Sequence, residues 1–430
     1  MPAPSTNTDG SFARIAARWP QVARALEAAP AVVVERAGTP PRLTVDGIQL
    51  ASAYDAEAEA TLQARSIEAV AREATVFGLG LGHLPRALLA RPALERLRVV
   101  LLAPGADRAA LEHEAGGAWL DDPRLTLALA WEDETPRPPF AVVPSALALA
   151  APAAFPLRDA LVIGLNRAFS AAPWQAQQAE LALRIDAHAT AFAGDRDIAT
   201  LFGSAVGQTV LVAGAGPTLA SGLAWLAARR VRTPAIAATA ALRPFAHAGL
   251  APDVAVALDP SSDLLSHLEH LEPAWLAAIA LAHAPIVTPE LMGAWPGPRY
   301  VFHPERPLYD AISARAPRGR LYAEGTVAHP ALDLAVRMGA SHVVLAGLDC
   351  AYVGGRTHAP GAPRDASVGE HRGARLALEN GRGELVWSDM NLVGYLRATE
   401  AFIASHPEVR FSVTSLDGAR IRGTTLVEAP

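Results

Sequence analysis

The sequence predicts an α/β protein built from two Rossmann-like units, a smaller one followed by a larger one. Short apolar runs of strand length alternate with segments of helical period, which is typical of parallel sheets covered by helices. A glycine-rich turn follows an early strand in each half, at 78–82 and at 214–216. Between the halves, the composition shifts to proline and alanine, which indicates a boundary.

Composition narrows the class of protein before any motif is considered. The chain has 430 residues, 51% of them hydrophobic and 19% charged, with a net charge of -6 and one cysteine, Cys350. This charge gives no reason to expect a nucleic-acid partner, and a single cysteine excludes an internal disulfide framework. The start lacks a basic segment followed by an apolar one, and the apolar run at 145–156 is broken by proline. We therefore expect a cytoplasmic protein without a membrane partner.

The sequence of the first half predicts a small α/β domain, which we expect to have no catalytic role. Its glycine-rich turn, 78–82, has the form of a Rossmann turn, but the end of the next strand, 102–105, offers no acidic residue to hold a ribose. We therefore favour a structural role for this turn. The expected elements are helices at 12–30 and 56–72, a hairpin-like region at 31–50, and strands at 74–78, 98–102 and 125–130.

The boundary between the halves is expected in the proline- and alanine-rich stretch 135–156. The predicted organisation has three parts: an N-terminal α/β domain at 1–150, a linker with connecting helices at 151–204, and a nucleotide-binding catalytic domain at 205–430.

The segment 209–260 organises the second half. Strands are expected at 210–213, 235–240 and 254–258. Gly214, Gly216 and Pro217 form a tight turn, and Thr218 begins a helix whose amides and dipole favour an anion. The turn matches neither the dinucleotide motif nor a P-loop, and the chain contains no lysine.

A second pattern of this kind lies at 322–361. Gly325 and Thr326 precede a helix that ends at Gly339, and a strand at 342–346 leads to Asp349, Tyr352 and His358. Small residues before this helix would expose a second N-terminus to the same anion. We therefore expect a nucleotide phosphate held largely by backbone amides.

No metal site is expected. His267 and His270 lie three residues apart on a helix predicted at 261–272, which could supply half of a site. Without a carboxylate partner of known geometry, a surface pair is the favoured interpretation.

These stretches resemble the motility accessory factor (Maf) glycosyltransferase family, whose core in turn resembles the MptE-like 6-hydroxymethylpterin diphosphokinases. The core motifs are also similar to those of bacterial CMP-sialic-acid transferases, which implies a sialyltransferase-like parallel sheet. The matching stretches are GAGPTL at 214–219, Pro252-Asp253 with Asp259-Pro260, GTVA at 325–328, GLD at 347–349, Thr357-His358-Ala359, DGARIRGT at 417–424 and, in the first half, GLGLGH at 78–83.

The resemblance implies a glycosyltransferase that moves a nonulosonic acid, of the pseudaminic or legionaminic type, from a CMP-activated donor to Ser or Thr of flagellin. Such an activity would support flagellum assembly and motility, with an inverting, metal-independent mechanism and no cofactor besides the donor. The residues that would hold the nucleotide are Gly214, Gly216, Pro217, Thr218, Asp259, Gly325 and Thr326.

The reacting centre implied by the resemblance contains Asp349, Tyr352 and His358. We favour His358 as a donor to the phosphate or a proton shuttle, and Asp349 as an orienting group or base. Two alternatives stay open: His358 as a loop histidine bound to backbone, and Asp349 as the cap of a strand-end turn.

Two rival functions also stay open. A diphosphokinase would move pyrophosphate from ATP to a pterin alcohol, with Mg²⁺ held by Asp253, Asp259 and Asp349. A non-catalytic relative would bind flagellin without binding a nucleotide.

Overall fold

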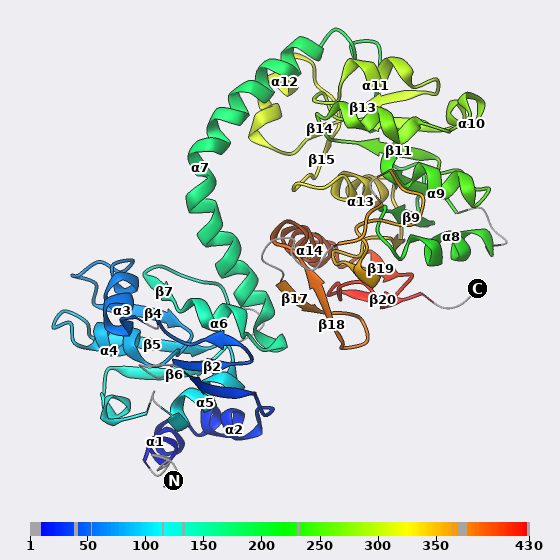
Figure 1. Ribbon diagram of the computed structural model, residues 1–430. Helices are drawn as coiled ribbons and strands as arrows, with labels where there is room; N and C mark the ends of the chain where they lie inside the picture. The colour runs from blue at the N-terminus through cyan, green and yellow to red at the C-terminus, as the bar shows by residue number, and fades with distance from the viewer. Residues whose placement is uncertain are drawn as a thin grey trace. The chain divides into compact units, whose positions relative to one another are not determined.

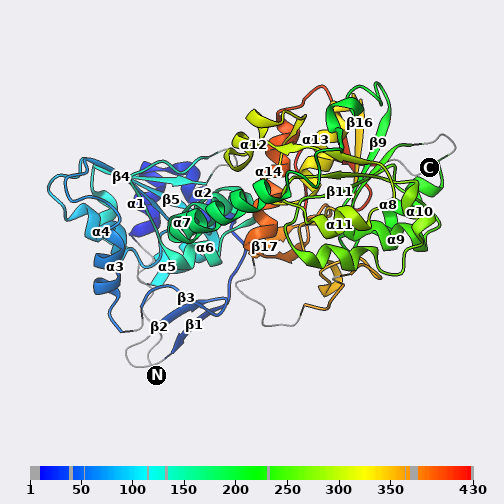
Figure 2. The ribbon, with the colours of Figure 1, turned by 90° about the horizontal axis from the view of Figure 1, so that it is seen from above.

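The chain folds into two compact units, Met1–Asn166 and Arg167–Pro430, called here the N-terminal and C-terminal units. Their division falls within the long helix α7 (Phe155–His188), drawn in Figures 1 and 2. The three-part organisation at 1–150, 151–204 and 205–430 stays a prediction. The computed structural model describes residues 10–37, 42–52, 54–113, 116–130, 134–229, 233–363, 365–368 and 376–427.

The N-terminal unit contains a four-stranded parallel sheet of order β6-β5-β4-β7. Its strands are β4 (Glu73–Phe77), β5 (Arg96–Leu101), β6 (Leu125–Leu129) and β7 (Phe140–Val142). A three-stranded antiparallel sheet precedes it, formed by β1 (Val34–Ala37), β2 (Arg42–Val45) and β3 (Ile48–Gln49). The helices are α1 (Ser11–Arg18), α2 (Pro20–Ala28), α3 (Ala56–Ala64), α4 (His83–Leu89), α5 (Pro104–His113) and α6 (Pro144–Ala148).

The structure differs from the expected elements of this unit in two segments that contain proline. The single helix expected at 12–30 is two helices, since Pro20 begins α2 and the residue before a proline is disfavoured in a helix. The stretch 135–156 supplies β7 and α6 to the unit, and the boundary expected there stays a prediction. Its apolar residues complete the sheet beside β4.

The C-terminal unit contains a nine-stranded parallel sheet of order β20-β19-β16-β9-β10-β11-β12-β13-β8. This confirms the predicted α/β fold with parallel sheets. The chain runs outward from β9 to β13 and then returns to the other side of β9 with β16, so the order reverses between β9 and β16. The strands are β8 (Arg196–Asp197), β9 (Thr209–Ala213), β10 (Ala235–Ala238), β11 (Val254–Ala257), β12 (Ala280–His283), β13 (Arg299–Val301), β16 (His342–Ala346), β19 (Arg410–Val413) and β20 (Thr424–Leu426).

Alternating side chains of these strands build a separate core on each face of the sheet, because successive residues of a strand point to opposite sides. On one face, Val210 and Val212 belong to the same cluster as Leu334 of α13 (Ala328–Arg337). On the other, Leu211 packs with residues of α8 (Leu219–Ala227) and α9 (Leu242–His247). The unit therefore has three layers, with helices on both sides of the sheet.

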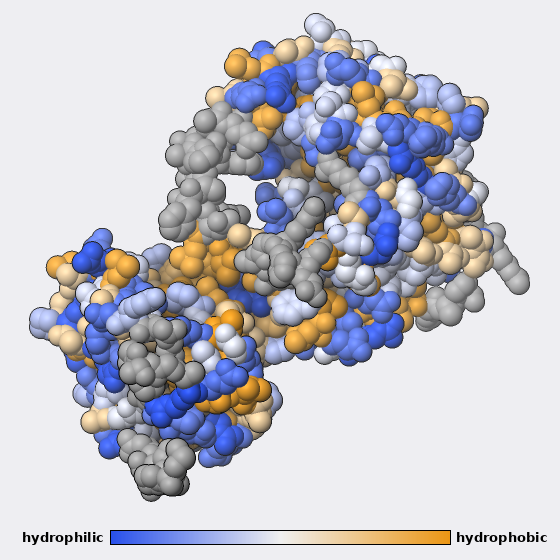
Figure 3. Space-filling model, viewed as in Figure 1, coloured by the Kyte–Doolittle hydropathy of each residue, from blue (hydrophilic) through white to orange (hydrophobic). Residues whose placement is uncertain are grey.

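Smaller elements complete the C-terminal unit. Two strand pairs stand apart from the large sheet: β14 (His303–Pro304) with β15 (Arg320–Leu321), and β17 (Leu376–Glu379) with β18 (Leu385–Ser388). The remaining helices are α10 (Pro273–Ala277), α11 (Pro289–Ala294), α12 (Asp310–Arg315) and α14 (Met390–Ala404). Among the helices that the structure describes, none combines the length and apolar character needed to cross a membrane. On the face in Figure 3, hydrophilic residues are mixed with smaller apolar groups.

Candidate active site

A cavity of about 590 Å³ opens at the carboxyl ends of β10 and β11 in the C-terminal unit. It gathers four of the predicted site residues, Asp259, Gly325, Thr326 and His358, from three distant stretches of the chain. Ligands of doubly wound sheets bind at this edge. The position of the cavity therefore agrees with the sequence argument for these four residues.

Gly325 and Thr326 form one wall of the cavity at the start of α13. Gly325 has a φ of 85°, and a Cβ atom there would lie 2.8 Å from the ring carbon Cε1 of Tyr395. Only glycine fits this conformation and this contact without strain. Because Tyr395 is on α14 and also lines the cavity, α14 closes the space beside the α13 turn.

His329, in the first turn of α13, fixes that turn against α14. Its Nδ1 accepts a hydrogen bond from the amide of Glu324 at 3.2 Å. Its Nε2 lies 3.2 Å from Oγ1 of Thr399 on α14. Burial lowers the pKa of His329 to about 4, so the ring is neutral at physiological pH. His329 is a positioning residue: it holds the Gly325 turn in register with Tyr395.

The charges around the cavity are mixed. Asp259 accepts a hydrogen bond from the amide of Ser261 at 2.8 Å, and its carboxylate stands at the mouth of the cavity. The pKa of Tyr395 is raised, first by burial and then by the negative charges of Asp389 and Asp259. Arg306 also lines the cavity and supplies a positive charge that can meet an anion.

Backbone amides of the glycine turn after β9 already donate hydrogen bonds within the protein. The Gly216 amide donates to the Gly347 carbonyl at 2.9 Å, and the Thr218 amide donates to Oδ2 of Asp349 at 2.9 Å. The Gly214 amide donates to Ala346. Those amides are not available to a phosphate in this arrangement, which corrects the expectation of an open anion site at the turn. The carboxylate of Asp349 fills the place of the expected anion.

Asp349 joins turns that follow three neighbouring strands. Besides Thr218, it bonds the loop after β19, because its carbonyl accepts from the amide of Ala419 at 2.8 Å. A Cβ atom at Gly216 would lie 2.4 Å from Oδ2 of Asp349, so the turn needs glycine there. Asp349 is 6% exposed, and burial raises its pKa. This geometry favours the strand-end cap that the sequence left open.

Tyr352 and Pro217 also lie outside the residues that line the large cavity. The hydroxyl of Tyr352 donates to the carboxylate of Asp389, whose Oδ1 caps α14 by accepting from the amide of Leu392 at 2.9 Å. Tyr352 therefore supports the start of the helix that carries Tyr395. His358 is linked to the glycine turn through its neighbour, since the Ala359 amide donates to the Ala215 carbonyl at 2.8 Å.

The predicted histidine pair does not share a helix face. A 3₁₀ helix spans Ser262–Leu268, and His270 lies beyond it with a φ of 63°. His267 is buried instead, with Nδ1 at 2.9 Å from Oγ1 of Thr239, and it lines the cavity. Across the described ranges, no three histidine, cysteine or acidic side chains gather as a metal site, so Asp253, Asp259 and Asp349 form no such cluster.

Sequence reasoning did not assign several of the residues that line the cavity to the site, although it named His267 for another reason. Arg306 and Tyr309 follow β14, His267 comes from the 3₁₀ helix, and Gln178 belongs to α7. Burial raises the pKa of Tyr309. The proximity of these residues arises from the way the loops and α14 fold over the sheet, so no motif marks them. Arg306 was the residue that the sequence could best have suggested, because it is an arginine in a loop-rich region after β13 and can meet an anion.

Comparison with known proteins finds a matching family model and similar solved structures. The family model "6-hydroxymethylpterin diphosphokinase MptE-like" matches residues 187–355. A solved structure, that of a Maf glycosyltransferase from Magnetospirillum magneticum AMB-1, is similar with 16% sequence identity and a TM-score of 0.48, covering 98% of this chain and 74% of that chain. No curated protein matches. The core of the C-terminal unit is thus similar to the MptE-like family, and the predicted resemblance is confirmed for that segment.

Proposed function

We propose that the C-terminal unit is a glycosyltransferase that moves a nonulosonic acid from a CMP-activated donor to a hydroxyl of flagellin. One observation carries the proposal: Asp259, Gly325, Thr326 and His358 surround a single cavity of about 590 Å³. This volume lies within the range typical of small-molecule sites. The match of residues 187–355 to the family model of an MptE-like diphosphokinase supports a phosphate-bearing ligand.

In the proposed complex, the donor phosphate lies at the α13 turn, beside Gly325 and Thr326, with Arg306 supplying positive charge. The dipole of a helix N-terminus favours an anion. The charge of Arg306 is needed as well, because the amides of Ala328 and His329 already donate to Thr326. Asp259, at the mouth of the cavity, accepts hydrogen bonds from the ribose or the base. The nucleotide thus lies in the cavity and not at the turn 214–218, whose amides are hydrogen-bonded within the protein.

The reaction breaks the bond between the anomeric carbon and the phosphate oxygen, and CMP leaves with the electron pair. The acceptor hydroxyl oxygen forms the new bond to that carbon. Its proton passes to His358, which lines the cavity. The developing charge on CMP is stabilised by Arg306 and the α13 turn. Asp349 and Tyr352 are proposed to position the β9 turn and α14, without touching the substrate.

Binding of CMP tests the site directly. We expect CMP to raise the melting temperature without Mg²⁺, because binding to the folded state alone stabilises it. Arg306→Ala should weaken this effect, while Arg420→Ala, which removes an exposed arginine outside the cavity, should not. Stabilisation by Mg-ATP but not by CMP would support the diphosphokinase instead. No effect of either nucleotide, with tight binding of flagellin, would support the non-catalytic relative.

Transfer itself is tested by the mass of flagellin incubated with CMP-pseudaminic or CMP-legionaminic acid. His358→Ala should abolish the added sugar mass while melting like the wild type. Tyr352→Phe should keep most of the activity, because its hydroxyl bonds Asp389 and not the cavity. Unchanged transfer by His358→Ala would remove this histidine from the reaction.

A further inference from the structure

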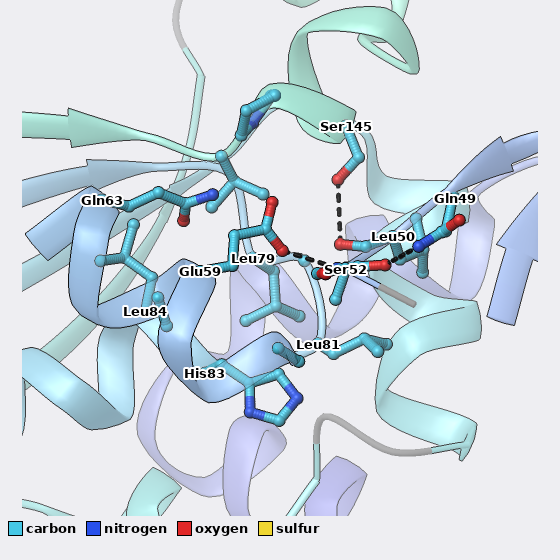
Figure 4. A pocket seen from close by; sticks show the side chains of 16 residues that line it. Gln49, Leu50, Ser52, Glu59, Gln63, Leu79, Leu81, His83, Leu84 and Ser145 are labelled. Carbon is cyan, nitrogen blue, oxygen red and sulfur yellow. Dashed lines mark hydrogen bonds between the residues drawn. The ribbon is translucent and has the colours of Figure 1, made fainter. Parts of the chain in front are cut away.

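A second cavity, of about 160 Å³, lies in the N-terminal unit at the carboxyl edge of its sheet. Its walls come from the segment after β3, from α3, from the glycine turn after β4 and from the start of α6, as Figure 4 shows. Small ligands of parallel α/β sheets bind at this edge. The mechanism proposed for the C-terminal unit makes no use of this space.

Two polar side chains of α3 line one wall of this cavity. Glu59 and Gln63 are one helical turn apart and therefore share a face. Oε2 of Glu59 accepts the Ser52 amide at 2.6 Å, a bond drawn in Figure 4. This bond holds the carboxylate in place and uses one of its roughly four acceptor positions, so it can accept further hydrogen bonds.

The opposite wall offers a hydroxyl. Ser145, at the start of α6, is 9% exposed and donates to the Leu50 carbonyl at 3.3 Å. This distance is long for a hydroxyl hydrogen bond. The Ser145 hydroxyl can therefore donate to an acceptor of a bound ligand instead, at little cost in free energy. Ser145, Gln63 and Glu59 together offer donors and acceptors to one small polar molecule.

The charges of the residues that line the cavity do not favour an anion. Asp107 lies beneath the glycine turn, where it accepts from the amides of Ala103, at 3.2 Å, and Leu79. The Leu79 amide is therefore used within the protein. Among the lining residues that the structure describes, there is no arginine, and Glu59 adds a negative charge. A phosphate or carboxylate ligand would meet the carboxylate of Glu59, while His83, which also lines the cavity, already lies 2.8 Å from a carboxylate oxygen of Glu57.

From these observations we infer that the cavity binds a neutral polyhydroxylated molecule the size of a single sugar ring. A carboxylate oxygen and a side-chain amide suit adjacent hydroxyl groups, as an acidic residue holds the ribose hydroxyls in dinucleotide-binding folds. The volume of about 160 Å³ corresponds to roughly ten water-sized probes, which is enough for one sugar ring. This site is separate from the proposed CMP-sugar site and does not depend on it.

Saturation-transfer NMR on the full chain tests the inference, with D-glucose, D-galactose, D-mannose and D-ribose as probes at millimolar concentration. At least one should receive saturation from the wild type. Glu59→Gln and Gln63→Ala should each weaken its binding about tenfold, the effect of one lost hydrogen bond. Glu59→Gln keeps an acceptor for Ser52, so the fold is retained.

Leu62→Ala is the matched control, because Leu62 is on the same helix and 64% exposed. It should leave sugar binding unchanged, and so should His358→Ala in the other unit. The inference is overturned if none of the four sugars binds, or if binding survives both Glu59→Gln and Gln63→Ala. It is equally overturned if ethanolamine displaces the sugar at lower concentration, because the carboxylate would then serve a cation.

Discussion

The buried Asp107 makes the stability of the N-terminal unit depend on pH in a direction opposite to that of an ordinary salt-bridged carboxylate. Burial raises the pKa of Asp107 from 3.8 to about 7, although two backbone amides partly oppose the shift. A group with a raised pKa stabilises the folded state while it is protonated. That stability is complete below pH 3.8 and is lost as the pH rises to about 7.

The size of the effect follows from the shift. Each unit of pKa difference corresponds to about 1.4 kcal/mol, so this shift corresponds to about 4 kcal/mol between acid and neutral pH. Asp107→Asn removes the titration and keeps one acceptor for the backbone amides. Other groups titrate alike in both proteins, so the difference between variant and wild type isolates Asp107. We expect the variant to become progressively more stable than the wild type from pH 4 to 7.

Calorimetry of the full-length proteins at a series of pH values measures this difference. The transition assigned to the N-terminal unit should shift between the two proteins, and the transition of the C-terminal unit should not. A constant difference across this range would refute the reasoning, because it would mean that the carboxyl group does not change its protonation there. A wild type that gains stability over the variant as the pH rises would refute it as well.

Two further predictions concern the C-terminal unit. Gly216→Ala places a methyl group 2.4 Å from Oδ2 of Asp349, so we expect urea denaturation to show a loss of about 1–3 kcal/mol in the free energy of unfolding. Gly293→Ala is the control, because no atom lies within 4 Å of the added methyl group. Equal losses in the two variants would contradict the clash. Because the pKa of His329 is lowered to about 4, its ring proton signals in NMR should stay constant from pH 8 to about 5. A midpoint near 6.5 would show that the ring is not buried as described.

The main strands and the parallel fold could be predicted because each strand is a run of apolar residues bounded by turn residues. The runs at 210–213, 254–258 and 342–346 all coincide with strands of the large sheet. The helix after Gly325 was predicted from its apolar spacing; it ends at Arg337, shortly before Gly339, which has a φ of 88°. Short helices and their types were harder to predict: the helix expected at 261–272 is a 3₁₀ helix that spans only Ser262–Leu268.

The site could be predicted only in part, because the order of strands in a sheet is not written in the sequence. Asp259, Gly325 and His358 meet because each follows a strand or begins a helix at the same edge. That Asp349 would satisfy the amide of Thr218 depends on β16 lying beside β9, although 131 residues separate the two partners. Local patterns could not distinguish a bound anion from this internal carboxylate.

The central place of β9 has a consequence for synthesis on the ribosome. Its partner on one side, β10, emerges soon afterwards, but its partner on the other side, β16, begins only at residue 342. Until then, a nascent chain that has paired β9 through β13 carries an open strand edge in the middle of its future sheet, and such edges recruit other chains. A translational pause before residue 342 would therefore prolong the stage at which the newborn protein is most prone to aggregate.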